Sequence, residues 1–421
     1  MKFENHQCSN GLTILGETNP EARAAAVGFF VRTGSRDETP EESGVSHFLE
    51  HMVFKGTRKR TADQVNKDFD RIGANYNAYT SEENTVFHAS TLPEYHSQAT
   101  DILADILHPA LRAADFETEK KVIIEEIGMY EDNPGWKVFD HARKNFFADH
   151  PLGNSVLGSV SSIQNMRRDQ MTAYFHRRYA PSNITVAAAG NFNWESFHKQ
   201  VEKLCSGWKP GSTRRDQIRQ TSGAAAFSLL KKESVKQQNL VLISPGPPAA
   251  SPLRYAACLL SLVLGDGSGS RFFWTLVDNG LADSADCAFH EYEGTGAFYS
   301  SFSFEPANTQ KILDIAMAQI RAVVEKGITD EELGQAKSKV LSRLVRGSEK
   351  TGNRLQDIGM SWVYLRKYIS IDETIQNFDK VSQRQIQQVL ERYPILHVTT
   401  TTLGPLGKLK APVVANGKKT V

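Results

Sequence analysis

The segment with the clearest chemical potential is residues 44–57, which reads GVSHFLEHMVFKGT. Successive residues of an α-helix turn by about 100°, so His47, Glu50 and His51 project from one face. Two imidazoles four residues apart can bind one zinc ion, and a carboxylate directly before the second histidine can reach the attacking water. This H-x-x-E-H order is the inverted zinc-protease signature, and about 0.04 copies are expected by chance at this composition. We therefore predict His47 and His51 as metal ligands and Glu50 as the general base.

A catalytic zinc site needs a third ligand on another element, because two histidines and a salt-bridged glutamate alone also fit an ordinary core helix. Residues 117–127, ETEKKVIIEEI, offer one. On a helix, Glu119 and Glu126 share the apolar stripe with Ile123, whereas Glu125 lies on the face directed to solvent. Buried carboxylates are costly unless a cation or hydrogen-bond donors compensate them. We predict one zinc ion per chain, with Glu126 as the third ligand and Glu119 orienting a ligand histidine; the alternative for the adjacent acids is a solvated pair.

Near the middle of the chain, the segment SGWKPGSTRR collects turn formers and charges without a period, which is typical of a linker. We place this linker at 206–224, between an N-terminal zinc-binding domain (1–205) and a C-terminal domain (225–421). The two domains end alike, because Tyr179 and Tyr393 each close a helical stretch and are followed by a proline and a strand-like run. Their separation of 214 residues is about half the chain and favours an internal duplication over a coincidence.

Hydrophobic periodicity predicts both strands and helices in each half. At the start of one predicted helix, Thr329 precedes Asp330, Glu331 and Glu332, which is typical of a capped N-terminus. Strands and helices mix without strict alternation, so we predict an α+β fold in which a sheet with helices over one face is built twice. The expected strands are 12–15, 26–31, 184–189, 239–243 and 395–403, and the expected helices are 254–264, 310–326, 330–345 and 382–393.

Composition limits the class of protein. The 421 residues are 40% apolar and 23% charged, which is typical of a globular chain of two or three domains. The net charge of +1 offers no overall attraction to nucleic acid or an anionic membrane, and the longest apolar runs, 24–31 and 256–264, are too short to span a bilayer. The first residues lack a secretory signal, and four scattered cysteines form no C-x-x-C pair, so we expect a soluble cytoplasmic protein. A periplasmic chain trimmed of its signal would look the same.

These residues make the sequence similar to the pitrilysin, insulin-degrading enzyme and mitochondrial processing peptidase family of zinc metallopeptidases. The resemblance covers most of the chain and is strongest in the first half. The family pattern has a metal-binding Glu about 75 residues after the second His, and Glu126 lies 75 residues after His51. It also has a second Glu seven residues earlier, which matches Glu119. The resemblance implies a zinc metalloendopeptidase acting on extended or unfolded peptides.

The resemblance also carries expectations about architecture and substrate binding. It implies duplicated α+β domains that form half of a clam-shell, and a homodimer or a heterodimer with a related subunit that encloses a chamber. The segment NAYTS at 77–81 is similar to a further family motif. By that likeness Asn77 and Ala78 would offer a strand edge to a peptide substrate, binding it through main-chain hydrogen bonds. Without the resemblance, Asn77 would as readily sit in a turn.

The second half departs from the family pattern at two positions. Active members carry an Arg and, seven residues later, a Tyr that supports the tetrahedral intermediate, whereas this chain has Leu276 and Asp283. An aspartate would repel a developing oxyanion. Either Arg271, His290 or Tyr292 substitutes, or a partner chain supplies the missing pair. Two rival functions stay open, a non-catalytic or assembly subunit of the same fold and a zinc hydrolase that acts on other substrates.

Overall fold

The computed structural model describes residues 1–211, 213, 215 and 220–412. The predicted linker at 206–224 therefore lies partly outside the described residues. Contacts group the chain into two compact units, each formed by three stretches. Unit 1 consists of Met1–Gly128, Asn154–Asp216 and Val345–Ile371, and unit 2 of Met129–Gly153, Gln217–Leu344 and Asp372–Val421.

Unit 1 is built on a mixed six-stranded sheet with the strand order β1-β2-β6-β3-β5-β4. Every residue of β3 is buried, because helices cover both faces of the sheet, and its sequence AAVGFFV is accordingly apolar throughout. β4 is the last strand in the order and pairs with β5. The strands are β1 Lys2–Gln7, β2 Thr13–Thr18, β3 Ala25–Val31, β4 Asn75–Thr80, β5 Thr85–Thr91 and β6 Ile184–Gly190.

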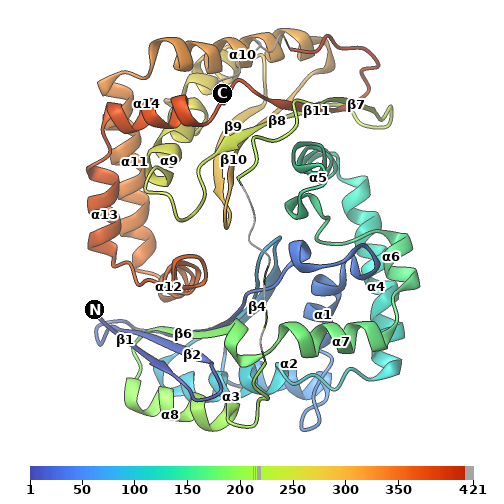
Figure 1. Cartoon of the computed structure of the whole chain (residues 1–421), viewed down its shortest axis with the longest axis vertical. Coiled ribbons are helices and arrows are strands. Elements are labelled where there is room, and N and C mark those ends of the chain that lie inside the picture. Colours follow the sequence, from blue (N-terminus) through green and yellow to red (C-terminus); the bar gives the residue numbers. More distant parts are fainter. Residues whose placement is uncertain (212, 214, 216–219, 413–421) are drawn as a thin grey trace. The chain divides into compact units, whose positions relative to one another are not determined.

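Most helices of unit 1 pack on one face of this sheet around a large apolar core that includes Phe29, Phe48 and Phe87. A single helix, α12, covers the other face, where Leu355 and Ile358 pack against the sheet (Figure 1). The helices are α1 Val45–Val53, α2 Ala62–Arg71, α3 His96–Ile106, α4 Ala113–Asp132, α6 Val160–Asn165, α7 Arg168–Arg178, α8 Trp194–Cys205 and α12 Thr351–Leu365.

Unit 2 has a five-stranded mixed sheet with the order β7-β11-β8-β10-β9. One face is covered by α9, α10, α11 and α14, and α5 covers the other through Val138, Ala142 and Phe146 (Figure 1). The elements are β7 Phe227–Lys231, β8 Gln238–Gly246, β9 Ser284–Glu291, β10 Gly296–Phe304, β11 Thr399–Gly404, α5 Pro134–Phe147, α9 Arg254–Leu264, α10 Thr309–Lys326, α11 Asp330–Ser348, α13 Ile371–Asp379 and α14 Gln383–Arg392.

The two sheets repeat one topology. In both, the strands taken in chain order occupy the same places, so that β2-β6-β3-β5-β4 corresponds to β7-β11-β8-β10-β9. The directions also agree, because the first pair is parallel in each sheet and the remaining pairs are antiparallel. This repetition confirms the predicted α+β class with a sheet-and-helix architecture that occurs twice. The expectation of helices over one face only is wrong, because α12 and α5 cover the second face of each sheet.

One pair of corresponding helices has changed places between the repeats. α5 comes from the first half of the sequence but packs on β8 and β11, and α12 comes from the second half but packs on β3 and β6. The two compact units therefore differ from the continuous ranges 1–205 and 225–421 by this exchange of helical segments.

Most predicted elements are confirmed within a few residues, and Thr329 caps α11 as expected by accepting a hydrogen bond from the Glu332 N–H at 3.1 Å. The strand predicted at 395–403 starts later, at Thr399, because the backbone after Pro394 first closes a turn in which the His397 N–H bonds the Pro394 carbonyl. Among the described residues, no helix combines the length and the apolarity that crossing a membrane requires.

Candidate metal centre

The centre is organised by α1, which starts directly after a tight turn. Gly44 precedes the helix with φ of 89°, and a Cβ there would lie 2.6 Å from the Leu157 carbonyl oxygen, so the turn requires glycine. Phe48, Leu49 and Met52 are buried in the core of unit 1. Packing on these side chains fixes the rotation of the helix and leaves its polar edge facing α4 and β4.

A buried carboxylate binds the first turn of α1. Glu38 accepts hydrogen bonds from the backbone N–H groups of Gly44, at 2.7 Å, and Ser46, at 2.8 Å. These donors belong to the group that a helix N-terminus leaves without intrahelical partners. Burial raises the pKa of Glu38 to about 8 despite these bonds. The Ser46 hydroxyl lies 2.7 Å from the Tyr174 hydroxyl, which ties the same turn to α7.

The three predicted ligands converge. The Nε2 atom of His47 lies 3.7 Å from Glu126 Oε1, and the Nε2 atom of His51 lies 3.5 Å from Glu126 Oε2. One donor atom from each of the three residues lies within 4.8 Å of the others. α1 supplies the histidines and α4 supplies the glutamate, so packing of the two helices assembles the group.

Glu119, two helical turns before Glu126 on the same stripe of α4, orients the second histidine. Its Oε1 atom lies 2.9 Å from His51 Nδ1, and its Oε2 atom lies 2.6 Å from the Lys55 ammonium. Burial alone would raise the pKa of Glu119, but the bonds from His51 and Lys55 hold that pKa below its ordinary value. The charged carboxylate therefore accepts the Nδ1–H of His51, which directs the His51 Nε2 atom toward Glu126.

The donor set fits zinc. Burial and the neighbouring His51 ring lower the pKa of His47 to about 3, so this imidazole is neutral and its nitrogen is free to bind a metal. Two imidazoles and one carboxylate form a three-residue ligand set that catalytic zinc sites use, in which a fourth position is left to water or substrate. Although burial opposes it, the bond to Glu119 and the nearby Glu126 carboxylate raise the pKa of His51, so a bound metal would displace a proton from this ring. The geometry thus agrees with the roles predicted for His47, His51 and Glu126.

The fourth polar residue of the site, Glu50, does not join this donor group and is held beside it. The Thr80 hydroxyl, at the end of β4, donates a hydrogen bond of 2.7 Å to Glu50 Oε2. Burial raises the pKa of Glu50, with Thr80 and His51 opposing the shift. A carboxylate with a raised pKa and one oriented oxygen is suited to accepting a proton.

β4 connects the metal centre to a free sheet edge. Asn77 pairs with His88 and Ala78 with Phe87 of β5, and within the described residues β4 has no second neighbour in the sheet. Asn77 is exposed. Because Thr80 lies on the same strand two residues after Ala78, an extended chain added to this edge would run past Glu50.

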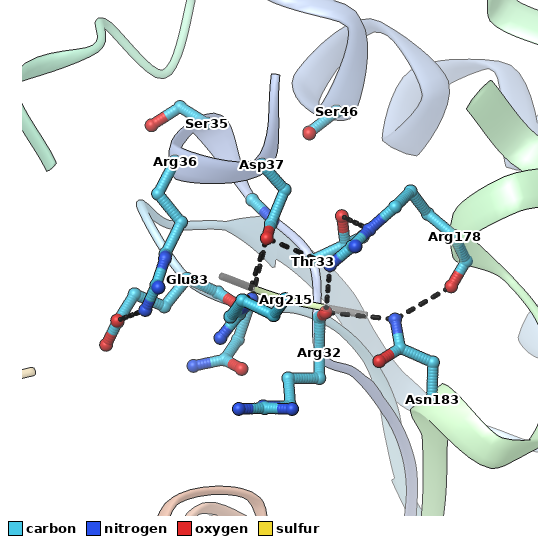
Figure 2. A network of polar contacts seen from close by, with 12 residues as sticks. Arg32, Thr33, Ser35, Arg36, Asp37, Ser46, Glu83, Arg178, Asn183 and Arg215 are labelled. Carbon is cyan, nitrogen blue, oxygen red and sulfur yellow. Dashed lines mark hydrogen bonds and ion pairs between the residues drawn. The ribbon is translucent and has the colours of Figure 1, made fainter. Parts of the chain in front are cut away.

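A buried polar network lies beside the start of α1 and near the turn after β4 (Figure 2). Asp37, in the short helix Ser35–Asp37, forms ion pairs of 2.9 Å with Arg178 and 2.7 Å with Arg215. Arg36 of the same short helix pairs with Glu83 in the turn between β4 and β5. These contacts fix the segment that leads into α1 relative to the strand that carries Thr80.

In unit 2, the two positions that depart from the family pattern have structural partners. Leu276 is fully buried in the apolar core, and the exposed Asp283 accepts a hydrogen bond of 2.9 Å from the Gln237 amide. Among the suggested substitutes, Arg271 forms a two-bond ion pair with Glu332 at 2.7 and 2.9 Å. The Tyr292 hydroxyl is buried and lies 3.0 Å from the Tyr299 hydroxyl, whereas His290 is exposed on β9.

Sequence reasoning missed three residues that shape the centre, namely Glu38, Lys55 and Thr80. Lys55 lies four residues after His51, a helical spacing that could have signalled its approach to Glu119. Thr80 belongs to the NAYTS segment but carries no local sign of a bond to Glu50. Glu38 lies in an irregular segment and gave no signal.

Comparison with known proteins gives two family matches that together span most of the chain. Residues 13–160 match the family described as "Insulinase (Peptidase family M16)", and residues 165–340 match "Peptidase M16 inactive domain". The chain is 31% identical to the uncharacterized zinc protease YmxG of Bacillus subtilis, covering 97% of this chain and 99% of that protein. It is 32% identical to an uncharacterized zinc protease of Streptomyces coelicolor, covering 94% of this chain and 88% of that protein.

Solved structures share the fold at low sequence identity. A peptidase M16 inactive domain from Pseudomonas fluorescens superposes with a TM-score of 0.90 at 17% identity, covering 97% of this chain and 99% of that chain. A protease from Helicobacter pylori gives 0.87 at 21% identity, covering 96% and 99%. A chain of complex III2 from Candida albicans gives 0.83 at 17% identity, covering 96% of each chain. These structures establish the architecture of both units.

Proposed function

This chain belongs to peptidase family M16, the insulinase family, and we propose that it is a zinc-dependent endopeptidase that hydrolyses extended or unfolded peptides. The observation that carries the proposal is the convergence of His47, His51 and Glu126, with the carboxylate of Glu50 held beside them by Thr80. An ordinary structural ion pair would not require a buried imidazole with a lowered pKa, two Nε2 atoms directed at one carboxylate, or a second carboxylate held beside them.

The chain's own residues divide the chemistry between them. His47, His51 and Glu126 would hold zinc, which when bound polarises the scissile carbonyl and lowers the pKa of the attacking water. Glu50 takes the proton of that water and delivers it to the leaving amine nitrogen. The Thr80 hydrogen bond keeps one oxygen of Glu50 in a fixed direction, so the other oxygen is available for proton transfer.

Substrate binding is proposed at the exposed edge of β4. Main-chain groups of Asn77 and Ala78 would pair with an extended peptide, which gives affinity with little demand on peptide sequence. The same strand carries Thr80, so a peptide seated on this edge is brought to Glu50 without a separate positioning element. This mode selects for unfolded or extended segments, because a folded substrate has no free strand to offer.

The test is cleavage of an unfolded peptide by the purified, zinc-loaded chain and two matched variants. Glu50→Gln should retain zinc and lose about 10²- to 10⁴-fold in turnover, the usual contribution of a general base. Glu125→Gln, the same change at an exposed acid of α4, should leave turnover unchanged. Retained turnover in Glu50→Gln would refute the role of Glu50. Cleavage of small esters or amides in place of peptides would refute the substrate class.

A second candidate function is that of a non-catalytic or assembly subunit, which the departures at Leu276 and Asp283 favour.

For the peptidase, we propose that a partner, either a copy of this chain or a related subunit, supplies the groups that are missing at these two positions and completes the site. Turnover should then appear or rise when the chain is paired, with dimer formation followed by light scattering. A zinc-loaded chain that cleaves nothing, alone or with the related subunit, would favour the non-catalytic function.

A further inference from the structure

A second group of metal-ligand side chains lies in unit 1, away from the residues proposed for peptide hydrolysis. One donor atom each from His6, Cys8 and Glu202 lies within 4.8 Å of the others, the same limit that the His47, His51 and Glu126 group satisfies. His6 Nε2 lies 3.7 Å from Glu202 Oε1. The three residues come from opposite ends of the first half of the sequence.

The fold fixes the donors on two elements. His6 lies on β1, and Cys8 follows the strand in a turn where its N–H bonds the Leu12 carbonyl at 2.8 Å and its carbonyl accepts the Gly11 N–H at 2.9 Å. Glu202 lies on α8, whose start is capped by the Asn193 side chain. Hairpin closure and helix packing therefore set the positions of these groups before any ion binds.

Helical spacing gathers further ligand types on the same face of α8. His198, Glu202 and Cys205 are at positions i, i+4 and i+7, which share one stripe of a helix. The His198 ring lies 5.4 Å from the His6 ring, centroid to centroid. Its Nδ1 atom lies 3.1 Å from the Trp194 carbonyl oxygen, so its Nε2 atom is the nitrogen left for another ligand.

The pairing of the polar atoms also points to a missing ligand. The Nε2 atom of His6 is buried and has no hydrogen-bond partner among the described residues, although a carboxylate lies 3.7 Å away. Cys8 is buried with 6% of its surface exposed, whereas Glu202 is exposed and offers an ion a route from solvent. A buried nitrogen that has no hydrogen-bond partner, although a carboxylate and a thiol lie within 4.8 Å, is the arrangement that a bound cation would satisfy.

We propose that His6, Cys8 and Glu202 bind a second zinc ion, with His198 as the fourth ligand. Sulfur and imidazole donors select zinc over magnesium or calcium, which prefer oxygen ligands. The Cys8 thiol releases its proton on binding, because the thiolate is the ligand. The ion joins β1, the edge strand of the sheet, to α8, so its role is to hold the N-terminal strand in place.

Zinc content tests this site separately from the first. The wild-type chain should bind two zinc ions, Cys8→Ala one, His51→Ala one, and the double variant none. The control Cys287→Ala, at a buried cysteine on β9, should still bind two. A wild-type chain that binds a single zinc ion, lost in His51→Ala and kept in Cys8→Ala, would overturn the second site and leave the proposed peptidase intact.

Cobalt gives a readout that does not depend on a foldable variant. Cobalt bound at the second site should show a thiolate-to-cobalt charge-transfer band in the near ultraviolet, which two histidines and a glutamate cannot produce. The band should persist in His51→Ala and disappear in Cys8→Ala. A cobalt-loaded wild-type chain without this band would contradict the proposal.

Discussion

The two units share one strand topology and differ in what their corresponding helices carry. α1 follows β3 in unit 1 and holds His47, Glu50 and His51, whereas α9 follows β8 in unit 2 and contains no histidine and no carboxylate. Its sequence RYAACLLSLVL is buried along most of its length. The same position in the fold therefore carries the candidate metal ligands in one repeat and is an apolar core helix in the other.

The partner helices differ in the same way. Counted from the first residue of each helix, Glu119 and Glu126 of α4 correspond to Ala336 and Arg343 of α11. Arg343 forms an ion pair of 2.8 Å with Asp266. Where unit 1 has a carboxylate facing two imidazoles, unit 2 has a cation that is already neutralised by a protein carboxylate.

This difference shows that the candidate metal centre is not a property of the fold. The repeated sheets supply a rigid frame, and a few polar residues on two helices determine whether a unit has a group of metal-ligand side chains. Buried polar groups are costly without partners, so unit 2 keeps its helix apolar, and unit 1 offsets the cost with Glu119, Thr80 and Glu38.

The largest expected effect comes from removing one ligand of unit 1. In His51→Ala only two of the three proposed zinc ligands, His47 and Glu126, remain. Zinc binding at this centre and peptide cleavage should therefore both be lost. The matched control is His397→Ala, a half-buried histidine just before β11 of unit 2, which should keep both. Metal analysis and peptide cleavage, with circular dichroism to verify folding, check the pair. Equal zinc loss in both variants would contradict the assignment of the centre to unit 1.

A smaller effect is expected at the orienting carboxylate. Glu119→Gln weakens the hold on His51 Nδ1–H and the pairing with Lys55, so zinc affinity should fall about 10- to 100-fold. The exposed Glu117 on the same helix provides the control Glu117→Gln, with no expected change in affinity. Competition with a chelator of known affinity measures both. An unchanged affinity in Glu119→Gln would mean that His51 is oriented by packing alone.

The start of α1 should give unit 1 a pH dependence. Burial raises the pKa of Glu38 from 4.5 to about 8, so the folded state binds this proton more tightly than the unfolded state. The stabilising contribution is present in full below about pH 4.5 and is lost as the pH rises through about 8. Urea unfolding across this range should show a steeper loss of unfolding free energy in the wild type than in Glu38→Gln. Equal slopes would show that Glu38 does not titrate there.

The smallest effect is expected in unit 2. Asp266→Asn removes the partner of Arg343 and Lys339, in a partly exposed pair, and should lower the free energy of unfolding by about 0–1 kcal/mol. Zinc content and peptide cleavage should not change. A loss of zinc in this variant would show that the two repeats are coupled, contrary to the comparison above.

Local sequence patterns were enough to identify those residues of the candidate site that lie on one helix within a few residues of each other. The i, i+4 histidines of α1 and the stripe that carries Glu119 and Glu126 on α4 follow from helix geometry alone. The positions of several strands and the doubled architecture were predictable in outline, because periodicity is a local property and the repeat leaves matching ends at Tyr179 and Tyr393. The order of the strands in each sheet was not predicted, because it depends on pairing between distant segments.

Contacts between residues distant in sequence could not be predicted in this way. The bond from Thr80 to Glu50 depends on how β4 pairs with β5 and packs on α1, and no spacing rule connects these two residues. The exchange of α5 and α12 is equally hidden, because each helix has an ordinary apolar face that fits either sheet. Glu38 reaches α1 from an irregular segment, where periodicity gives no information.

The most direct test of the account is the position of zinc in crystals of the metal-loaded chain, located by anomalous scattering at the zinc edge. We predict a peak bonded to Nε2 of His47, Nε2 of His51 and a carboxylate oxygen of Glu126, and no peak in unit 2. Zinc bound elsewhere while these three side chains carry no ion would contradict the central claim.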